Sequence, residues 1–284
     1  MIKIMSDSTC DLSPELLIKY DVTILPLHVL MGDKEYIDGI NITPDEIYEW
    51  SDSVKETPKT SAVGIEDAIN EFKRYTDRGY EIIVFSISDD MSTTGNVFRL
   101  AAEELGMQDK IHVVNSANLS TGVGHLVVEA SILAKAGKSA DEILEYLENI
   151  KDKVRSSFVI DTLVYLARGG RCSSVAALAG GLLKIHPKIV VANGKMEATK
   201  KYRGSIDRAI LNYVKDMESE LYNAKEDRVF ITHSGCDKEV IDQVYEYLKG
   251  LNHFKEILVT RAGSVISSHC GPGTLGVLFI DKVE

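Results

Sequence analysis

The sequence has few cysteines, no long apolar run and no surplus of positive charge. Its 284 residues include four cysteines, Cys10, Cys172, Cys236 and Cys270, which lie far apart and form no C-x-x-C pair. This spacing fits reduced thiols better than a disulfide framework or a structural zinc site. No apolar stretch approaches the ~20 residues of a membrane span, and residues 1–4 do not lead into a signal peptide. We therefore expect a cytoplasmic protein without stable membrane insertion.

The charge balance argues against a nucleic-acid partner. The chain carries 32 Lys and Arg against 43 Asp and Glu, a formal net charge of -11. Binding to a phosphate backbone rewards clustered Lys and Arg, so an acidic chain is a poor candidate for it. With 44% hydrophobic and 26% charged residues, the composition is that of a globular protein long enough for two domains.

The common catalytic and nucleotide-binding motifs are missing. There is no G-x-x-x-x-G-K-[ST], no H-E-x-x-H and no G-x-S-x-G, and the segment 122–124 lacks the third glycine of the dinucleotide fingerprint. The seven histidines are scattered without metal-ligand spacing. We therefore assign no catalytic residue, no metal and no cofactor.

The first half of the chain alternates strand and helix patterns. Apolar runs at 2–5, 22–31, 81–88 and 111–114 predict strands. Helix starts are marked by Ser13-Pro14, by Thr43-Pro44 and by a capping box from Ser139 to Glu142. This alternation predicts a three-layer α/β/α domain with a mainly parallel sheet over residues 1–157. Such sheets bind ligands at the loops that follow the strands.

The second half follows a different pattern and predicts an α/β domain with a mixed sheet over residues 158–284. We expect strands at 158–160 and 228–232, and a strand at 188–192 that turns at Asn193-Gly194. His186-Pro187 is expected to end a small-residue helix over 175–183. Two closing strands are expected on either side of a turn at 267–273. The boundary rests on the change of pattern alone, and the domains need not be continuous.

Four clusters are rich in hydroxyl groups and lie next to expected strand ends or helix starts: 60–61, 88–94, 116–120 and 267–269. Hydroxyls, an imidazole and free N–H groups are suited to hold a single anion. Two plainer interpretations stay open. Ser92 or Thr93 could only cap a helix, and 267–273 could be a tight turn with an exposed histidine.

Two basic segments stand out in this acidic chain. Residues 168–171 read Arg-Gly-Gly-Arg, and residues 200–204 read Lys-Lys-Tyr-Arg-Gly. Guanidinium groups beside a turn suit a phosphate or the carboxylates of a partner. The alternative is a solvated surface without a function.

The ordered set of motifs resembles the DegV family along the whole chain. No single motif decides this, but their order and number are specific. The motifs are Ser6-Asp7-Ser8-Thr9-Cys10-Asp11-Leu12, Lys59-Thr60-Ser61, residues 88–94, Asn115-Ser116 with Gly122-Val123-Gly124, Arg168-Gly169-Gly170-Arg171, Arg203-Gly204, His233-Ser234-Gly235-Cys236-Asp237 and His269-x-Gly-Pro-Gly-x-Leu-Gly.

The resemblance implies a two-domain α/β protein that holds one long-chain fatty acid between its domains. It further implies that a separate fatty acid kinase phosphorylates the bound carboxyl group with ATP, and that the acyl phosphate enters phospholipid synthesis. No cofactor beyond the bound fatty acid is implied.

Site residues of the family carry over to positions of this sequence. The carboxylate site falls on Thr60 with Ser61, on Ser92 with Thr93, and on His269. The arginines linked to phosphotransfer or the kinase partner fall on Arg171 and Arg203.

The chain departs from the family pattern at three places. Residues 60–63 read Thr-Ser-Ala-Val where the family usually has Thr-Ser-Gln-Pro. Thr93 replaces the glycine of Leu-Ser-Gly-Thr, and Asn115 replaces an aspartate. For the acyl tail, the candidate lining segments are 24–30 and 175–183.

Two other functions are left open by the residues. One is a serine-dependent hydrolase or acyltransferase that uses Ser92 or Ser268 with His269. The other is a kinase-docking regulatory module in which Arg171 and Arg203 matter and the lipid does not.

Overall fold

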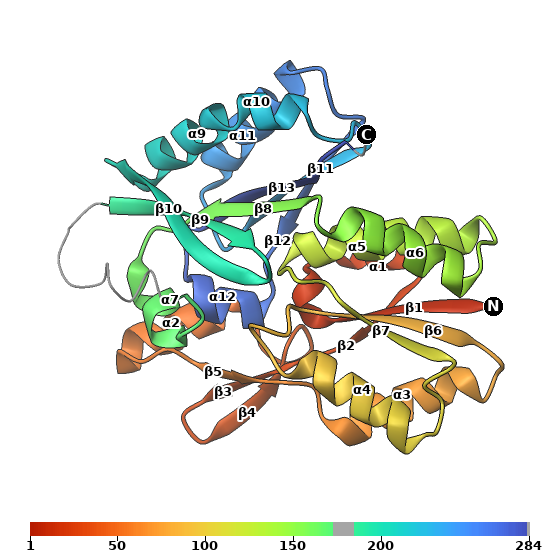
Figure 1. The fold of residues 1–284 in the computed structure, drawn as a ribbon. Coiled ribbons are helices and arrows are strands. Elements are labelled where there is room, and N and C mark those ends of the chain that lie inside the picture. The colour runs from red at the N-terminus through yellow and green to blue at the C-terminus, as the bar shows by residue number, and fades with distance from the viewer. Residues whose placement is uncertain (173–184, 283–284) are drawn as a thin grey trace.

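The computed structural model describes residues 1–172 and 185–282. Its N-terminal half is built on a parallel sheet of strand order β2-β1-β6-β7, as the alternating pattern predicts (Figure 1). The strands are β1 (Ile2–Asp7), β2 (Val22–Leu25), β6 (Glu81–Ser86) and β7 (Ile111–Asn115). Their carboxyl ends deliver the loops that begin at Ser8, Ile87 and Ser116 to one edge of the sheet.

Helices cover both faces of this sheet. On one side lie α3 (Ile65–Thr76) and α4 (Thr94–Glu104), and on the other α1 (Pro14–Tyr20), α5 (Thr121–Lys135) and α6 (Ala140–Lys151) (Figure 1). The predicted caps are confirmed: the Ser13 side chain accepts the Leu16 N–H, and Ser139 forms a capping box. The result is the expected three-layer arrangement.

The second half is built on a mixed sheet of order β10-β9-β8-β13-β11-β12, which confirms the predicted fold class. Among its described strands, only β11 and β12 pair in parallel, and three of the described helices cover one face. The opposite face packs against α5, which therefore lies between the two sheets (Figure 1). The elements are β8 (Val154–Val159), β9 (Ile185–Ala192), β10 (Lys195–Arg203), α9 (Ile206–Asp216), α10 (Glu218–Tyr222), β11 (Arg228–His233), α11 (Lys238–Gly250), β12 (Glu256–Arg261) and β13 (Leu275–Ile280).

The expected boundary at 157 lies inside β8, so the division at this residue stays a prediction. The hairpin turn at Asn193-Gly194 is confirmed, since it joins β9 to β10. His186 and Pro187 lie within β9, which begins at Ile185. Pro187 lacks an N–H, and it stands just beyond the last register pair of β9 with β8, where that donor is not needed. The helix expected at 175–183 lies outside the described residues.

The single strand expected at 22–31 is wrong. Pro26 cannot donate to a sheet ladder, and the chain leaves β2 there to form β3 (His28–Met31). This strand pairs antiparallel with β4 (Lys34–Ile37) and β5 (Lys59–Ser61) in a small second sheet. Between β4 and β5 runs α2 (Pro44–Val54), which carries the chain's one tryptophan, Trp50, partly buried against the N-terminal core.

The expectation of a strand that ends in a turn at 267–273 is wrong over residues 264–270, where a helix stands, whereas the closing strand expected after the turn is confirmed as β13. Residues Ser264–Cys270 form a short helix, α12, which contacts α2, α7 (Leu163–Gly169), β3 and β5. Its N-cap is Gly263, which has no capping side chain, so local sequence gives no helix signal. A short 3-10 turn, η1 (Ser8–Cys10), follows β1 and also touches α12.

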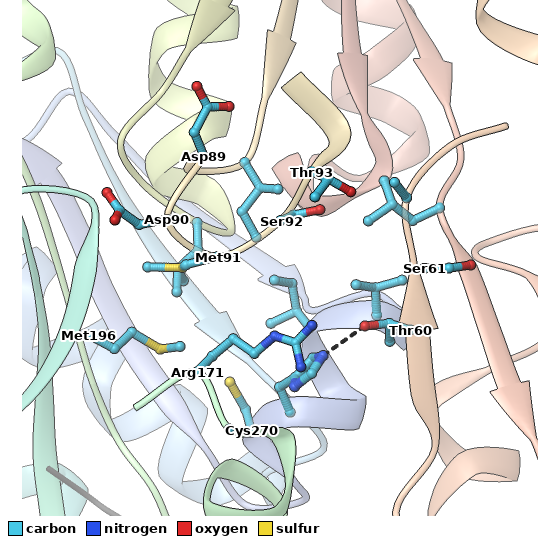
Figure 2. A pocket seen from close by; sticks show the side chains of 18 of the residues that line it. Thr60, Ser61, Asp89, Asp90, Met91, Ser92, Thr93, Arg171, Met196 and Cys270 are labelled. Carbon is cyan, nitrogen blue, oxygen red and sulfur yellow. Dashed lines mark hydrogen bonds between the residues drawn. The ribbon is translucent and has the colours of Figure 1, made fainter. Parts of the chain in front are cut away.

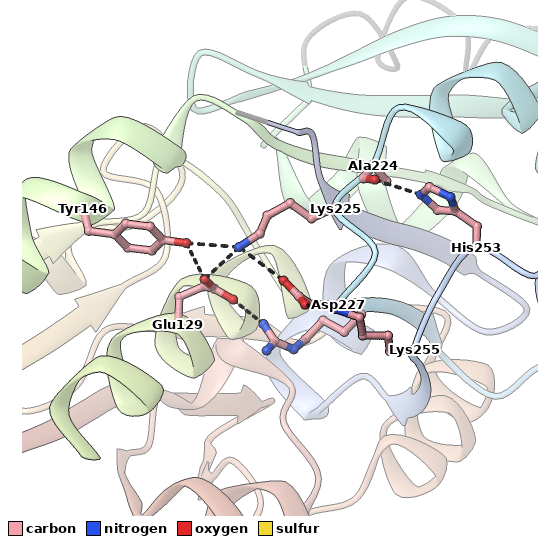
Figure 3. Close-up of polar contacts among 8 residues, drawn as sticks. Glu129, Tyr146, Ala224, Lys225, Asp227, His253 and Lys255 are labelled. Carbon is pink, nitrogen blue, oxygen red and sulfur yellow. Dashed lines mark hydrogen bonds and ion pairs between the residues drawn. The ribbon is translucent and has the colours of Figure 1, made fainter. Parts of the chain in front are cut away.

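A buried ion-pair network links α5 to the mixed sheet (Figure 3). The Glu129 carboxylate accepts from Arg228 Nη1 at 2.5 Å, from Tyr146 Oη at 2.6 Å and from Lys225 Nζ at 3.1 Å. Burial alone would raise the pKa of Glu129, but the Tyr146 hydrogen bond and the two cations outweigh it and lower that pKa. Within the described ranges, no helix has the length and apolar composition needed to cross a bilayer.

Candidate ligand-binding site

A cavity of about 710 Å³ opens where α12 meets β5 and the loop after β6 (Figure 2). Segments from both halves of the chain contribute to its wall. Its lining combines polar residues, which carry hydroxyl, carboxylate and cationic groups, with apolar residues, and these two sets are called its polar side and its apolar side below. The polar lining residues are Thr60, Ser61, Asp89, Asp90, Ser92, Thr93, Arg171, Lys195 and His269.

Thr60 and His269 meet on the polar side. Thr60 Oγ1 lies 2.9 Å from His269 Nε2, a hydrogen bond that joins β5 to α12. Nδ1 of the same ring has no hydrogen-bond partner among the described residues. The ring packs directly against Gly169, where any Cβ would collide with Nδ1. Any residue other than glycine at position 169 would therefore displace the His269 ring.

The imidazole of His269 is neutral at physiological pH. Burial, together with a smaller contribution from the nearby charge of Arg171, lowers its pKa to about 4. A neutral imidazole carries one N–H donor and one acceptor nitrogen, and a threonine hydroxyl can serve as either. The pair can therefore direct a donor toward an oxygen in the cavity.

Ser92 and Thr93 form the loop that leads into α4. Ser92 Oγ lies 2.9 Å from Thr94 Oγ1 and accepts the Thr94 N–H at 3.3 Å. Ser92 thus takes part in the helix start and also lines the cavity. Thr93 is the N-cap residue, but its side chain makes no capping bond. Its φ of -86° is ordinary for any residue, so this position does not require the glycine of the family pattern.

The structure separates the two arginines. Arg171 lines the cavity, donates to the Gly169 carbonyl at 2.6 Å and extends toward Thr60 (Figure 2). Arg203 is exposed at the end of β10, paired with Ile185, and is not part of the cavity lining. Ser61 lines the cavity from an exposed position.

The apolar side was mostly missed from sequence. A smaller gap of about 20 Å³ adjoins it and leads toward Phe158 and Leu278 in the interior. Of the tail segments predicted from sequence, 24–30 contributes Leu27, while 175–183 lies outside the described residues. The apolar lining is Leu27, Ala62, Ile87, Met91, Leu119, Met196, Val265, Ile266 and Cys270.

The hydroxyl cluster at 116–120 does not reach the cavity as a donor. Its only lining residue is Leu119, and the Ser116 hydroxyl donates to the Asn118 carbonyl at 3.2 Å. Asn115, which replaces an aspartate of the family pattern, accepts the Asp89 and Ala117 N–H groups through its Oδ1. An amide oxygen is sufficient for both bonds.

The hydroxyls of two serines of α12 donate to backbone carbonyls in the helix or just before it. Ser268 Oγ donates to the Ser264 carbonyl at 2.8 Å, and Ser267 Oγ donates to the Ala262 carbonyl at 3.2 Å. The hydroxyl that forms a hydrogen bond with His269 belongs to Thr60 and not to one of these serines. The arrangement provides a polar anchor beside an apolar wall and does not pair a serine with the histidine.

The model of the DegV family, described as "Uncharacterised protein, DegV family", matches residues 1–282. The chain belongs to the DegV family. A DegV domain-containing protein from Clostridium perfringens is 33% identical over 289 residues, covering 99% of this chain and 98% of the relative.

Solved DegV structures share the whole fold. A DegV family protein from Thermus thermophilus, described for its fatty acid binding, has a TM-score of 0.90 at 29% identity, with 99% of each chain covered. A stearic acid-binding protein from Eubacterium ventriosum has a TM-score of 0.86 at 29% identity, with 99% of each chain covered. For DegV of Bacillus subtilis, a fatty acid binding protein, the values are 0.83 and 27%, also with 99% of each chain covered.

Proposed function

We propose that this DegV protein binds one long-chain fatty acid in the cavity between its two halves. The hydrogen-bonded pair Thr60 and His269 on the polar wall is the observation that carries the proposal. A carboxylate seated there receives one donor from this pair, the Thr60 hydroxyl, and another from Ser92. Ser61 and Thr93 flank the same position, and the guanidinium of Arg171 adds a positive charge.

The acyl tail is the second half of the proposal. A fatty acid that follows the apolar wall buries its methylenes, each of which stabilises the complex by about 0.8 kcal/mol. The gap toward Phe158 and Leu278 extends this path into the interior. A polar anchor joined to an apolar wall suits an amphipathic acid better than a nucleotide or a sugar. The names of three similar structures, at 27–29% identity, support the same ligand class.

We further propose that the protein is a carrier and not an enzyme by itself. It would present the bound acid to a fatty acid kinase, which forms the acyl phosphate used in phospholipid synthesis. Arg171, at the cavity, suits a phosphorylated head group, and the exposed Arg203 suits the kinase surface. Four widely spaced thiols without a disulfide fit a reducing cytoplasm.

The direct test is mass spectrometry of lipid extracted from the purified, denatured protein. We expect one class of long-chain fatty acid, and we expect delipidated protein to take up added fatty acid. The Thr60→Ala, His269→Ala double variant is the matched control and should retain less acid. Absence of extracted acid together with absence of uptake would refute the proposal.

The kinase arm needs a separate measurement. Acyl phosphate formation by a fatty acid kinase should depend on both this protein and its bound acid. Formation that is independent of bound lipid would favour a docking module instead.

A further inference from the structure

Three aspartates, Asp7, Asp11 and Asp38, form a buried acidic hub behind the cavity. Their exposed fractions are 0%, 5% and 4%. In the described part of the chain, none of the three forms an ion pair with a cation. Each is satisfied by N–H and hydroxyl donors instead, and those donors come from the segments that build the cavity wall.

Asp7 holds the loop after β6. Its Oδ2 accepts the Ile87 N–H at 2.8 Å, and its Oδ1 accepts the Thr9 N–H and hydroxyl. Ile87 lines the cavity and begins the loop that carries Ser92. The carboxylate therefore fixes one side of the proposed head-group site.

Asp11 and Asp38 hold the N-terminal end of α12. Asp11 Oδ1 accepts the Gly263 N–H at 2.8 Å, and Asp38 Oδ1 accepts the Ser264 N–H at 2.7 Å. Asp11 Oδ2 also accepts the Ser120 hydroxyl at 2.5 Å, beside Leu119 of the cavity wall. Two carboxyl groups from the first 40 residues thus anchor a helix from the end of the chain.

The position of α12 decides where His269 lies. The helix has seven residues, so its ends are about 10 Å apart and it moves as one rigid unit. His269 stands in its last turn and meets Thr60 across the cavity wall. A shift of the helix at its anchored end would therefore also move His269 and change the Thr60–His269 hydrogen bond.

The hub is also electrostatically matched to this helix end. Unpaired N–H groups and the positive end of the helix dipole compensate carboxylates that no cation compensates. Burial still raises the pKa of Asp7 to about 6 and that of Asp11 to about 8, and it raises the pKa of Asp38.

We propose that Asp11 and Asp38 are positioning residues that set α12, and thereby His269, for the carboxyl group of the ligand. This inference rests on the proposed fatty acid site. It predicts that the hub controls recognition of the head group and leaves the tail wall unchanged.

The test compares two ligands that differ only in the head group. Binding of myristic acid and 1-tetradecanol is measured by competition with a fluorescent fatty acid on delipidated protein. Asp38→Ala should weaken the acid about tenfold and the alcohol less than twofold. Asp38→Asn keeps an acceptor oxygen and should reduce the loss of affinity for the acid to about threefold. Equal losses for both ligands, or no loss for the acid, would overturn the inference.

Two control variants separate positioning from stability. Asp242→Asn removes an exposed carboxylate on α11, and Tyr213→Phe removes a buried hydroxyl that bonds Ser157 and Val277 in the other core. Neither should change the acid-to-alcohol ratio, even though Tyr213→Phe lowers stability. If Asp38→Ala does not fold, the same binding comparison is made with Asp11→Asn and Asp38→Asn. Each should lower the affinity for the acid about threefold and leave the affinity for the alcohol unchanged.

A ligand-free readout keeps this inference distinguishable from the proposed function. If the delipidated wild type binds neither ligand, the proposed function fails. The ¹⁵N chemical shifts of the His269 ring in the ligand-free protein then test whether the hub positions this ring. They should move in Asp38→Ala and stay in Tyr213→Phe, and unchanged shifts in Asp38→Ala would overturn the hub's role.

Discussion

Two buried carboxylate clusters join segments from the two halves of the chain, and they are neutralised in opposite ways. Glu129 meets Arg228 and Lys225, and its pKa is lowered. The acidic hub meets backbone N–H and hydroxyl groups, and the pKa values of its three aspartates are raised. The first cluster is a set of ion pairs that links α5 to the mixed sheet. The second cluster positions the wall of a cavity, and in the described part of the chain its aspartates pair with no cation.

The difference shows how one fold separates stability from recognition. The cations that pair with Glu129, Arg228 and Lys225, do not line the cavity, whereas the cations of the cavity lining are Arg171 and Lys195. Each cluster can therefore be altered with a different expected consequence.

The largest expected effect is on the Glu129 cluster. Glu129→Gln leaves Arg228 and Lys225 without their buried counter-charge, which should lower the free energy of unfolding by about 3 kcal/mol. Urea denaturation measures this loss. The control Glu246→Gln removes an exposed partner of Lys249 and should cost less than about 0.5 kcal/mol. Equal costs for the two variants would contradict the distinction.

The next effect is on the cavity itself. The double variant Thr60→Ala, His269→Ala removes the polar anchor, and we expect fatty acid affinity to fall about 100-fold. Isothermal titration with delipidated protein measures the change, and circular dichroism checks that the fold is kept. An affinity equal to that of the wild type would remove these residues from the site.

The pH dependence of stability should differ between the clusters. An aspartate whose pKa is raised in the folded state binds more protons folded than unfolded between its unfolded value of 3.8 and its folded value. Its contribution is thus complete below pH 3.8 and is lost as pH rises toward 8. Glu129, with a lowered pKa, contributes above its unfolded value of 4.5 and loses this as pH falls.

Asp11→Asn should therefore flatten the decline of stability between pH 4 and 8, by at most about 1.4 kcal/mol per pH unit. Urea denaturation at several pH values, with Asp242→Asn as the parallel series, gives the slopes. A slope identical to that of the wild type would mean that Asp11 is ionised in the folded protein.

The smallest effect compares the two arginines, which carry the same charge at different places. Arg171→Ala should weaken fatty acid binding about threefold at low salt, because its charge is close but exposed and therefore screened. Arg203→Ala should change the affinity less than twofold, because Arg203 does not line the cavity. A larger loss for Arg203 than for Arg171 in direct lipid binding would reverse the assignment.

Local sequence predicted the elements that carry their own signals. Ser13 and Ser139 cap helices, and Asn193-Gly194 forms a hairpin turn. The alternation of apolar strand segments with helix segments predicts the parallel sheet. In each case the residues that cause the structure lie within a few positions of it. Proline at 26 also carried a signal, since it ends β2, but the apolar run on both sides hid it.

Helix α12 could not be predicted in the same way. Its capping groups are Asp11 and Asp38, more than 220 residues earlier in the chain. The sequence around 267–269 therefore indicated a turn. It gave no sign that the hydroxyls of Ser267 and Ser268 donate to backbone carbonyls. His269 was singled out as part of the cluster 267–269 and again by the family motif, while its contact with Thr60 needed the fold. The available signal for the hub was the run Asp7 to Asp11 directly after an apolar strand.

The place of α2 has an optical consequence. This helix carries the chain's one tryptophan, Trp50, and it packs directly against α12. All indole emission of the protein thus arises from one partly buried site beside the helix that bears His269. A substitution that displaces α12 should accordingly change the intrinsic fluorescence of the protein, without any attached dye.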